Sequence, residues 1–187
     1  MNVTSYIKRN AFPLGTIALF ITLFVVAVAN LLYESKILVD EYMAKEIDQL
    51  AKVFTDIDDD CAIISFEHQK NYIDFLNVKK FAGTTVGSMS IMFPDKWKGP
   101  YFQDTPSVFG NPYLIVRTKK GYFITPPEGT RLSNGKVVGT DISLAENADL
   151  EKAGRTTLKF KEMSLARRIK TTGVLGPITQ VILPEEE

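Results

Sequence analysis

The chain has 187 residues, 45% hydrophobic and 24% charged, which suits one folded domain with an additional segment rather than two full domains. Its 22 Lys and Arg residues balance its 22 Asp and Glu residues, so the charge gives no reason to expect a nucleic-acid partner. Cys61 is the only cysteine and His68 the only histidine, which excludes an internal disulfide and most histidine-based metal sites.

An uncharged and largely apolar run near the N-terminus predicts a membrane-spanning helix. It covers residues 11–33, and about 20 residues that rise ~1.5 Å each are enough to cross the hydrocarbon layer of a bilayer. Lys8 and Arg9 precede the run, whereas Glu34 and Asp40 follow it. Because positive charge stays on the cytoplasmic side, we expect a single pass with the N-terminus in the cytoplasm and the remaining domain on the other side of the membrane.

A cleaved secretory signal is the alternative interpretation of this run. Such a signal has an apolar core of about 7–15 residues followed by a small-residue cleavage site. The run here is longer, and residues 30–34, Asn-Leu-Leu-Tyr-Glu, contain no such site. The sequence therefore favours a retained span.

The segment after the span has the pattern of an amphipathic helix. Met43, Ile47, Leu50, Phe54 and Ile57 recur at steps of three and four residues, which places them on one face. No proline or glycine occurs from residue 16 to residue 60, so one continuous helix is expected, half in lipid and half lying on a domain. A short coiled-coil stalk that dimerises remains open as an alternative.

An acidic cluster at residues 56–60 is expected to end this helix and to cap the next element, because carboxylates at a helix C-terminus oppose the dipole. It lacks the spacing of an EF-hand, so no metal site is predicted there. Residues 61–66 indicate a short strand or helix start. Residues 71–81 indicate a helix that turns Tyr72, Phe75, Leu76 and Val78 inward.

From residue 90 onward the pattern shifts toward the period of β-strands. Residues 113–118 and 121–125 predict a hairpin around Lys119 and Lys120, and Asn134-Gly135 predicts a tight turn. Further on, residues 156–161 indicate a strand and residues 162–170 a short helix, and the apolar residues 173–183 indicate a tail that packs on the domain or docks on a partner. The predicted fold class is α+β, a long N-terminal membrane-spanning helix packed on a small antiparallel sheet.

A loop rich in proline, glycine and aromatic residues joins the two halves of the domain. It is predicted to be a structural element with an apolar underside, because prolines and glycines fix its backbone and aromatic rings cover one side. The residues that define it are Trp97, Gly99, Pro100, Tyr101, Pro106, Gly110, Pro112 and Tyr113.

This loop resembles that of the major pseudopilin of type II secretion, a member of the type IV pilin-like family. Residues 97–102 read Trp-Lys-Gly-Pro-Tyr-Phe and residues 109–114 read Phe-Gly-Asn-Pro-Tyr-Leu, where the family has W-x-G-P-Y-L and then D-P-W-G-N-P-Y before a strand. The calcium-binding loop of the family has no counterpart here, so no metal and no cofactor are carried over.

The N-terminus resembles that of a prepilin. The resemblance implies a basic leader at residues 1–11, cleavage by a prepilin peptidase between Ala11 and Phe12, and methylation of the new N-terminus. Ala11 stands where the family has glycine, Pro13 where it has threonine, and Thr16 where it has the glutamate that pairs with a neighbouring subunit during assembly. These departures favour a minor or divergent pseudopilin, or an uncut relative.

The resemblance implies a structural subunit of a type II secretion or type IV pilus-like filament, which assembles with itself or with related pilin-like subunits. It also implies that the helix spans the inner (cytoplasmic) membrane and that the globular head lies in the periplasm. The expected limits are a leader at 1–11, a membrane half of the helix at 12–33, an amphipathic half at 34–60, a globular head at 61–145 and a C-terminal extension at 146–187. The alternative is a single-span accessory or scaffold protein whose extracytoplasmic domain binds a partner.

Catalysis is not expected, and neither is a small-molecule substrate. Cys61 and His68 could be imagined as a thiol–imidazole pair, but a lone cysteine in an apolar run is usually a core residue. None of the G-x-S-x-G, P-loop, G-x-G-x-x-G or H-E-x-x-H patterns occurs in the chain.

Overall fold

The computed structural model describes residues 11–173; the rest of the predicted leader and the tail beyond Gly173 lie outside the described residues. One helix, α2 (Ala11–Cys61), accounts for 51 of these residues. The chain divides into two compact units between Val39 and Asp40, and each is described by itself.

In the first unit, α2 carries the apolar run. Within the described part of the chain it is the one helix long and apolar enough to cross a membrane, and none of its most apolar 18-residue window is buried. The helix continues without a break into the second unit. The expectation of one continuous helix through residue 60 is therefore confirmed.

In the second unit, the remainder of α2 supplies one wall of the core. The five predicted stripe residues, Met43, Ile47, Leu50, Phe54 and Ile57, are all 0% exposed. Burying a side chain of this size stabilises a fold by about 1.5–3 kcal/mol, so this stripe holds the helix firmly on the domain. The period of the hydrophobic residues predicted this face correctly.

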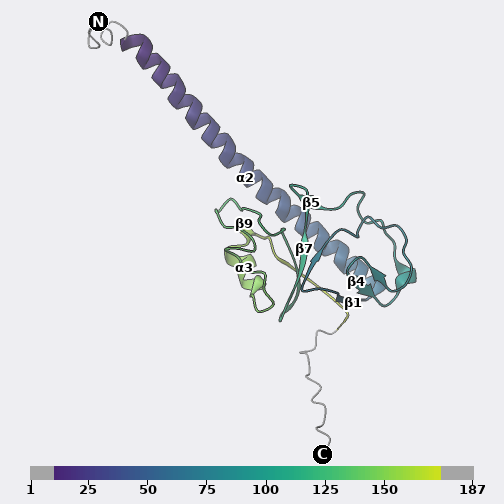
Figure 1. The fold of residues 1–187 in the computed structure, drawn as a ribbon. Coiled ribbons are helices and arrows are strands. Elements are labelled where there is room, and N and C mark those ends of the chain that lie inside the picture. The colour runs from purple at the N-terminus through teal and green to yellow at the C-terminus, as the bar shows by residue number, and fades with distance from the viewer. Residues whose placement is uncertain (1–10, 174–187) are drawn as a thin grey trace, which may run out of the picture. The chain divides into compact units, whose positions relative to one another are not determined.

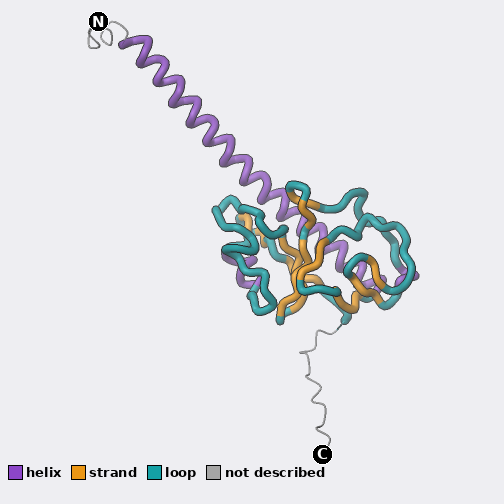
Figure 2. Tube along the Cα trace, in the orientation of Figure 1, coloured by secondary structure: helices purple, strands orange, loops and turns teal. Residues whose placement is uncertain are grey.

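A four-stranded antiparallel sheet packs on this part of the helix (Figures 1 and 2). Its order is β11–β8–β7–β2. The strands are β2 (Lys70–Tyr72), β7 (Leu114–Thr118), β8 (Gly121–Thr125) and β11 (Arg167–Ile169). Strands β7 and β8 form the predicted hairpin, with Leu114 opposite Thr125 and Thr118 opposite Gly121.

Smaller elements complete the second unit. They are β1 (Ile63–Phe66), β3 (Thr85–Val86), β4 (Met89–Ile91), the 3-10 helix η1 (Pro94–Lys96), β5 (Ser107–Val108), β6 (Asn111–Pro112), α3 (Leu150–Thr156), β9 (Lys159–Phe160) and β10 (Met163–Ser164). Strands β1, β4 and β3 form a three-stranded antiparallel sheet, and β5–β6 and β9–β10 are two short hairpins.

An aromatic cluster joins the helix to two sheets. The ring of Phe54 on α2 lies edge-to-face on Phe66 of β1 and on Phe75, with ring centroids 6.2 and 6.3 Å apart. Phe66 in turn contacts Tyr122 of β8 at 4.8 Å. Edge-to-face pairs of this kind add about 0.5–1.5 kcal/mol each beyond the area that they bury, so the cluster ties the layers together.

The predicted helix at residues 71–81 is wrong. Residues up to Tyr72 belong to β2, and the chain then continues without regular structure. Burial alternates here, since Asn71, Ile73 and Phe75 are buried whereas Tyr72 is exposed. The spacing of the aromatic and aliphatic residues is compatible with a helix. The structure instead pairs residues 70–72 with β7, because hydrogen bonds to a neighbouring strand outweigh a local helical preference.

Of the elements predicted after residue 155, the strand at residues 156–161 is confirmed in part and the helix at residues 162–170 is wrong. The helix α3 ends at Thr156, and β9 (Lys159–Phe160) lies within the range where the strand was expected. Strands β10 and β11 lie where the helix was expected. Strand β11 is hydrogen-bonded to β8, a pairing between segments far apart in sequence that no local pattern shows. The predicted limits of the head at residues 61–145 stay a prediction, and the α+β layout with small antiparallel sheets is shown.

Candidate functional site

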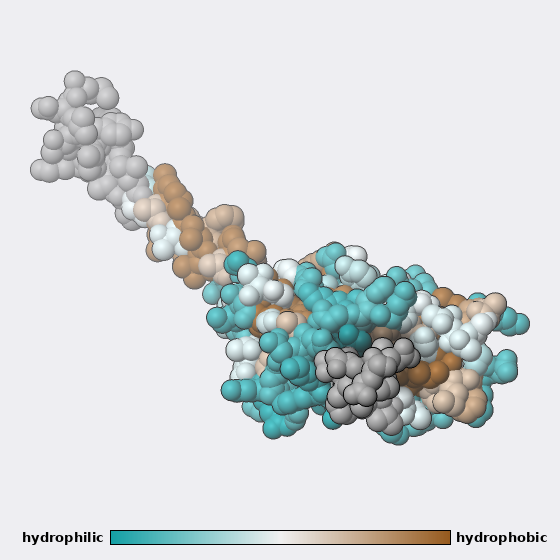
Figure 3. Space-filling view, turned by 60° about the horizontal axis from the view of Figure 1, so that its bottom comes forward, coloured by the Kyte–Doolittle hydropathy of each residue, from teal (hydrophilic) through white to brown (hydrophobic). Residues whose placement is uncertain are grey.

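The first unit of the chain presents an apolar helix surface. The hydroxyl of Thr22 donates to the carbonyl oxygen of Ala18 at 2.9 Å, so this polar side chain is satisfied within the helix. Figure 3 shows the hydrophobic colour along this helix. A continuous apolar surface of this kind needs lipid or other helices to cover it. Its exposed large side chains are Ile17, Leu19, Phe20, Ile21, Leu23, Phe24, Val25, Val26, Val28, Leu31, Leu32, Tyr33 and Leu38.

In the second unit, the predicted structural loop begins at Trp97, directly after η1. The indole Nε1 donates to the carbonyl oxygen of Val78 at 3.0 Å. The ring of Trp97, which is half-buried, lies edge-to-face on Phe81 and on Tyr101, with centroids 5.4 and 4.9 Å away. These contacts fasten the loop to the irregular segment that follows β2.

The backbone of the loop repeats this attachment. The amides of Tyr101 and Phe102 both donate to the carbonyl oxygen of Leu76, at 2.8 and 3.3 Å. Gly99 passes so close to Val78 that a Cβ there would lie 2.5 Å from its carbonyl oxygen. No side chain fits at this position, which explains why a glycine stands between Trp97 and the exposed Pro100.

The turn between β5 and β6 carries an exposed aromatic ring. Phe109 and Gly110 form it, and both have positive φ, 51° and 79°. Glycine adopts this conformation easily, whereas a bulky residue is strained in it. Phe109 is also 77% exposed, so its ring gains little from burial. Pro112 follows in β6 and is half-buried.

The loop ends at Tyr113, which connects it to α2. Tyr113 is fully buried, its amide donates to the carbonyl oxygen of Pro106 at 3.4 Å, and its hydroxyl donates to the Glu46 carboxylate at 2.7 Å. Burial raises the pKa of Glu46, although hydrogen bonds from Tyr113 and Tyr42 act in the opposite direction. Burial, together with the Glu46 carboxylate, also raises the pKa of the Tyr113 hydroxyl.

Two buried carboxylates on α2 were not expected from the sequence. Asp40 is 1% exposed, and its Oδ2 accepts hydrogen bonds from the backbone amide of Ser133 at 2.9 Å and from its hydroxyl at 2.6 Å. Its Oδ1 is buried without a hydrogen-bond partner among the described residues. Asp40 lies three residues before Met43 and therefore on the same face of the helix as the hydrophobic stripe. This position could have predicted its burial from the sequence.

Asp58 is the second buried carboxylate, at 2% exposure. It accepts hydrogen bonds from the amides of Ile63 and Thr172 at 2.9 and 2.8 Å, and from the Thr172 hydroxyl at 3.1 Å. The acidic cluster therefore does cap the next element, as predicted. Asp58 also joins the end of α2 to the last described segment of the chain.

Other carboxylates of the acidic cluster form ion pairs. Asp59 lies 3.1 Å from the ammonium of Lys170, and Asp60 lies 2.7 Å from that of Lys98. Across residues 11–173, no group of three or more His, Cys, Asp or Glu side chains is arranged to hold a metal ion.

The imagined thiol–imidazole pair is not supported by its surroundings. Cys61 is fully buried, and burial followed by the nearby Asp60 raises the pKa of its thiol. A raised pKa is the opposite of what a nucleophilic thiol needs. His68 is exposed, with its Nε2 3.7 Å from Glu67.

The predicted loop residues thus belong to one connected structural loop, fixed at Trp97, Gly99 and Tyr113. Ala11 and Phe12 lie in the first turn of α2, and processing between them stays a prediction. Searches against protein-family models, curated proteins and solved structures found no match for this chain.

Proposed function

We propose that this chain is a membrane-anchored, pilin-like structural subunit that assembles, through α2, into a filament of the type II secretion or type IV pilus class. One observation supports the proposal most. A single helix of 51 residues exposes an apolar surface over its first half and buries the stripe from Met43 to Ile57 over its second half.

This helix suits a subunit that leaves the bilayer and packs against its neighbours. A helix satisfies its own backbone hydrogen bonds, so it is stable both in lipid and among other helices. Small residues such as Ala18 and Ala27 allow the close approach of a second helix. The domain is then carried along with the helix, because the second part of α2 is buried in its core.

The proposed location is the inner membrane with the N-terminus in the cytoplasm. Lys8 and Arg9 before the span and Glu34 and Asp40 after it support this orientation. The proposed partners are copies of this chain or related pilin-like subunits, together with a prepilin peptidase.

The first test is the mass of the N-terminal peptide of the protein isolated from its native membrane. A chain that begins at Phe12 with a methylated amine supports processing by a prepilin peptidase. A chain that begins at Met1 contradicts this processing and favours the single-span accessory protein instead.

A second test measures assembly directly. The double variant Ala18→Cys/Ala27→Cys, oxidised in the native membrane, should give a ladder of disulfide-linked oligomers on a non-reducing gel. Cys61 can remain because it is fully buried, and the unmodified chain is the matched control. Products that stop at the dimer would indicate the coiled-coil stalk, and monomer alone would contradict assembly through the helix.

A further inference from the structure

A small apolar patch lies on the outer face of the sheet that contains β1 and β4. Ile63 of β1 pairs with Ile91 of β4, and both are 0% exposed. Successive side chains of a strand point to opposite faces, so the residues that follow, Ile64 and Met92, lie on the outer face, at 43% and 53% exposure. Phe93 comes next and is 45% exposed. We refer to Ile64, Met92 and Phe93 as the apolar patch.

Backbone hydrogen bonds hold the members of the patch next to one another. The carbonyl oxygen of Ala62 accepts from the amide of Met92 at 3.0 Å, and that of Cys61 accepts from the amide of Phe93 at 2.9 Å. Ile64 and Met92 stand diagonally across the two strands, a spacing that long side chains can bridge. The patch is therefore one continuous surface rather than three scattered residues, and such a surface indicates a contact.

The last described residue of the chain lies beside this patch, at the outer edge of β1. The amide of Gly173 donates to the carbonyl oxygen of Ile63 at 2.9 Å, and a Cβ on Gly173 would collide with the carbonyl oxygen of Ile64. Just before it, the amide and the hydroxyl of Thr172 donate to the Asp58 carboxylate at 2.8 and 3.1 Å. These bonds fix the point from which the following residues start.

The segment that follows Gly173 is apolar and starts within reach of the whole patch. Strand β1 separates Gly173 from Met92, so the two lie about two strand spacings apart, ~10 Å. About three residues of extended chain cover this distance. Residues 174–183 carry no charge, and six of them are large aliphatic residues: Val174, Leu175, Ile178, Val181, Ile182 and Leu183.

Apolar burial favours contact between this segment and the patch. The segment is joined covalently to a residue that already contacts β1, so its effective concentration at the patch is at least on the order of millimolar. Both surfaces are apolar, so their contact removes hydrocarbon from water without stripping water from a charge. Unlike an ion pair at an exposed site, this contact is not screened by salt.

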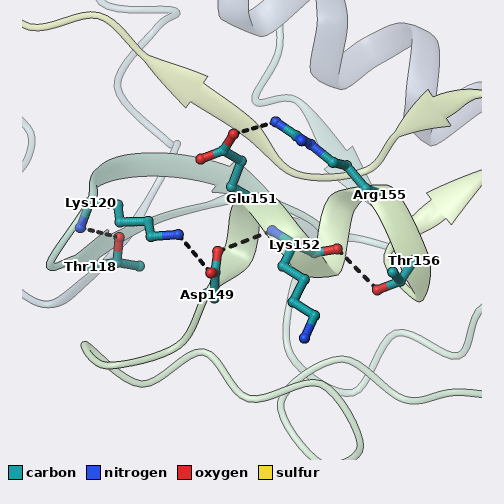
Figure 4. A network of polar contacts seen from close by, with 7 residues as sticks. All are labelled: Thr118, Lys120, Asp149, Glu151, Lys152, Arg155 and Thr156. Atoms are coloured by element: carbon teal, nitrogen blue, oxygen red, sulfur yellow. Dashed lines mark hydrogen bonds and ion pairs between the residues drawn. The ribbon is translucent and has the colours of Figure 1, made fainter.

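The surface around α3 is polar instead. Lys120 lies 2.6 Å from the Asp149 carboxylate, and Arg155 pairs with Glu151 one turn earlier on the helix (Figure 4). An apolar segment over these side chains would take their water away and give them no new hydrogen-bond partner, which costs free energy. Of the two surfaces, the apolar patch is the one that suits residues 174–183.

We propose that the apolar patch binds residues 174–183 of the same chain, with Val174 and Leu175 over Ile64 and the later residues over Met92 and Phe93. This contact lies within one chain and does not depend on filament assembly. It is tested on the full-length protein in phosphatidylcholine vesicles, where its failure would leave the proposed function unaffected.

The experiment places the photo-cross-linker p-benzoylphenylalanine at position 93, in place of Phe93, and maps its products by peptide mass spectrometry. The matched control carries it in place of Phe109, which is exposed in the same unit but lies outside the patch. We expect position 93 to join residues 174–183 at least fivefold more often than position 109 does. The variant Val174→Ser/Leu175→Ser/Ile178→Ser should lower this yield at least threefold, and 0.5 M NaCl should leave it unchanged.

A second measurement keeps Phe93 and compares the oxidation of methionines by hydrogen peroxide in the wild-type chain and in the triple serine variant. The rate for Met92 should rise about two- to fivefold in the variant, and that for Met163, which lies in β10, should not change. Equal cross-linking from positions 93 and 109, a yield that falls in salt, or an unchanged Met92 rate would overturn the proposal.

Two further outcomes would identify a different occupant of the patch. A mixture of ¹⁴N- and ¹⁵N-labelled chains that gives mainly hybrid cross-links from position 93 would overturn the proposal, because the patch would then bind a second copy. Cross-links from position 93 mainly to phosphatidylcholine would overturn it too, because the patch would then lie on lipid.

Discussion

The hydrogen bond from Tyr113 to Glu46 attaches the loop to α2, and Tyr113→Phe removes this bond alone. The ring stays, so the buried volume hardly changes. A hydrogen bond to a charged group contributes about 1.5–3 kcal/mol, and we take about 1.5 kcal/mol because Glu46 is half-exposed and solvent screens it. At about 2–4 °C per kcal/mol for a chain of this size, the Tm should fall by about 3–6 °C at pH 7.

The pH dependence of this loss identifies its cause. The hydroxyl favours the ionised form of Glu46, whose pKa is raised by burial, so Tyr113→Phe raises that pKa further. As the pH falls through the pKa of Glu46, the carboxyl takes up a proton and the bond weakens to that of a neutral pair. The difference in Tm between the two proteins should therefore be largest at pH 7 and shrink toward pH 4.

The assay is thermal unfolding of the full-length chain in detergent, followed by circular dichroism at several pH values. Tyr42→Phe is the matched control, because Tyr42 contacts the same carboxylate but is exposed; it should shift the Tm by less than about 2 °C. In a protein that already carries Glu46→Gln, adding Tyr113→Phe should lower the Tm by the same amount at every pH. A wild-type Tm for Tyr113→Phe at pH 7, or a loss that is constant from pH 7 to pH 4, would refute this reasoning.

Four other substitutions test the same unit by thermal unfolding. Trp97→Ala should lower the Tm by roughly 4–10 °C, since it removes two edge-to-face pairs, one of them with Phe81, and the indole hydrogen bond; an unchanged curve would show that the loop does not contribute to the core. Asp58→Ala leaves the amides that it caps without an acceptor and should cost about 1–3 kcal/mol, whereas Thr172→Val, which removes only the hydroxyl contact, should cost less. Phe109→Gly should leave the Tm unchanged or raise it slightly, because it relieves a positive φ while losing an exposed ring; a fall of several degrees would mean that the ring packs on the domain.

The parts of the fold that the sequence predicted are those that depend on local spacing. The stripe from Met43 to Ile57 repeats with the period of a helix. The hairpin around Lys119 and Lys120 is marked by two short runs of β-branched and aromatic residues on either side of a turn. Gly135 has a φ of 84°, which confirms the tight turn at residues 134–135. This turn could be predicted because an Asn-Gly pair is itself a local signal for positive φ.

The parts that it missed depend on contacts between distant residues. At residues 71–81 the apolar spacing fitted a helix, but Asn71 bonds the backbone of His68 through its side chain and pairs with Ile115 of β7. The partner of Asp40 lies 93 residues away at Ser133, and that of Asp58 lies 114 residues away at Thr172. No periodic pattern encodes such pairs.

The burial of the stripe along one face of α2 has a mechanical consequence within the second unit. A pull along the axis of α2 between Asp40 and Cys61 is carried by the ladder of backbone hydrogen bonds to the buried stripe. There the load acts on the contacts of Met43, Leu50 and Ile57 in parallel, because all three lie on the same face of one helix. Pulling this part of α2 out of the second unit therefore requires breaking contacts along the whole stripe.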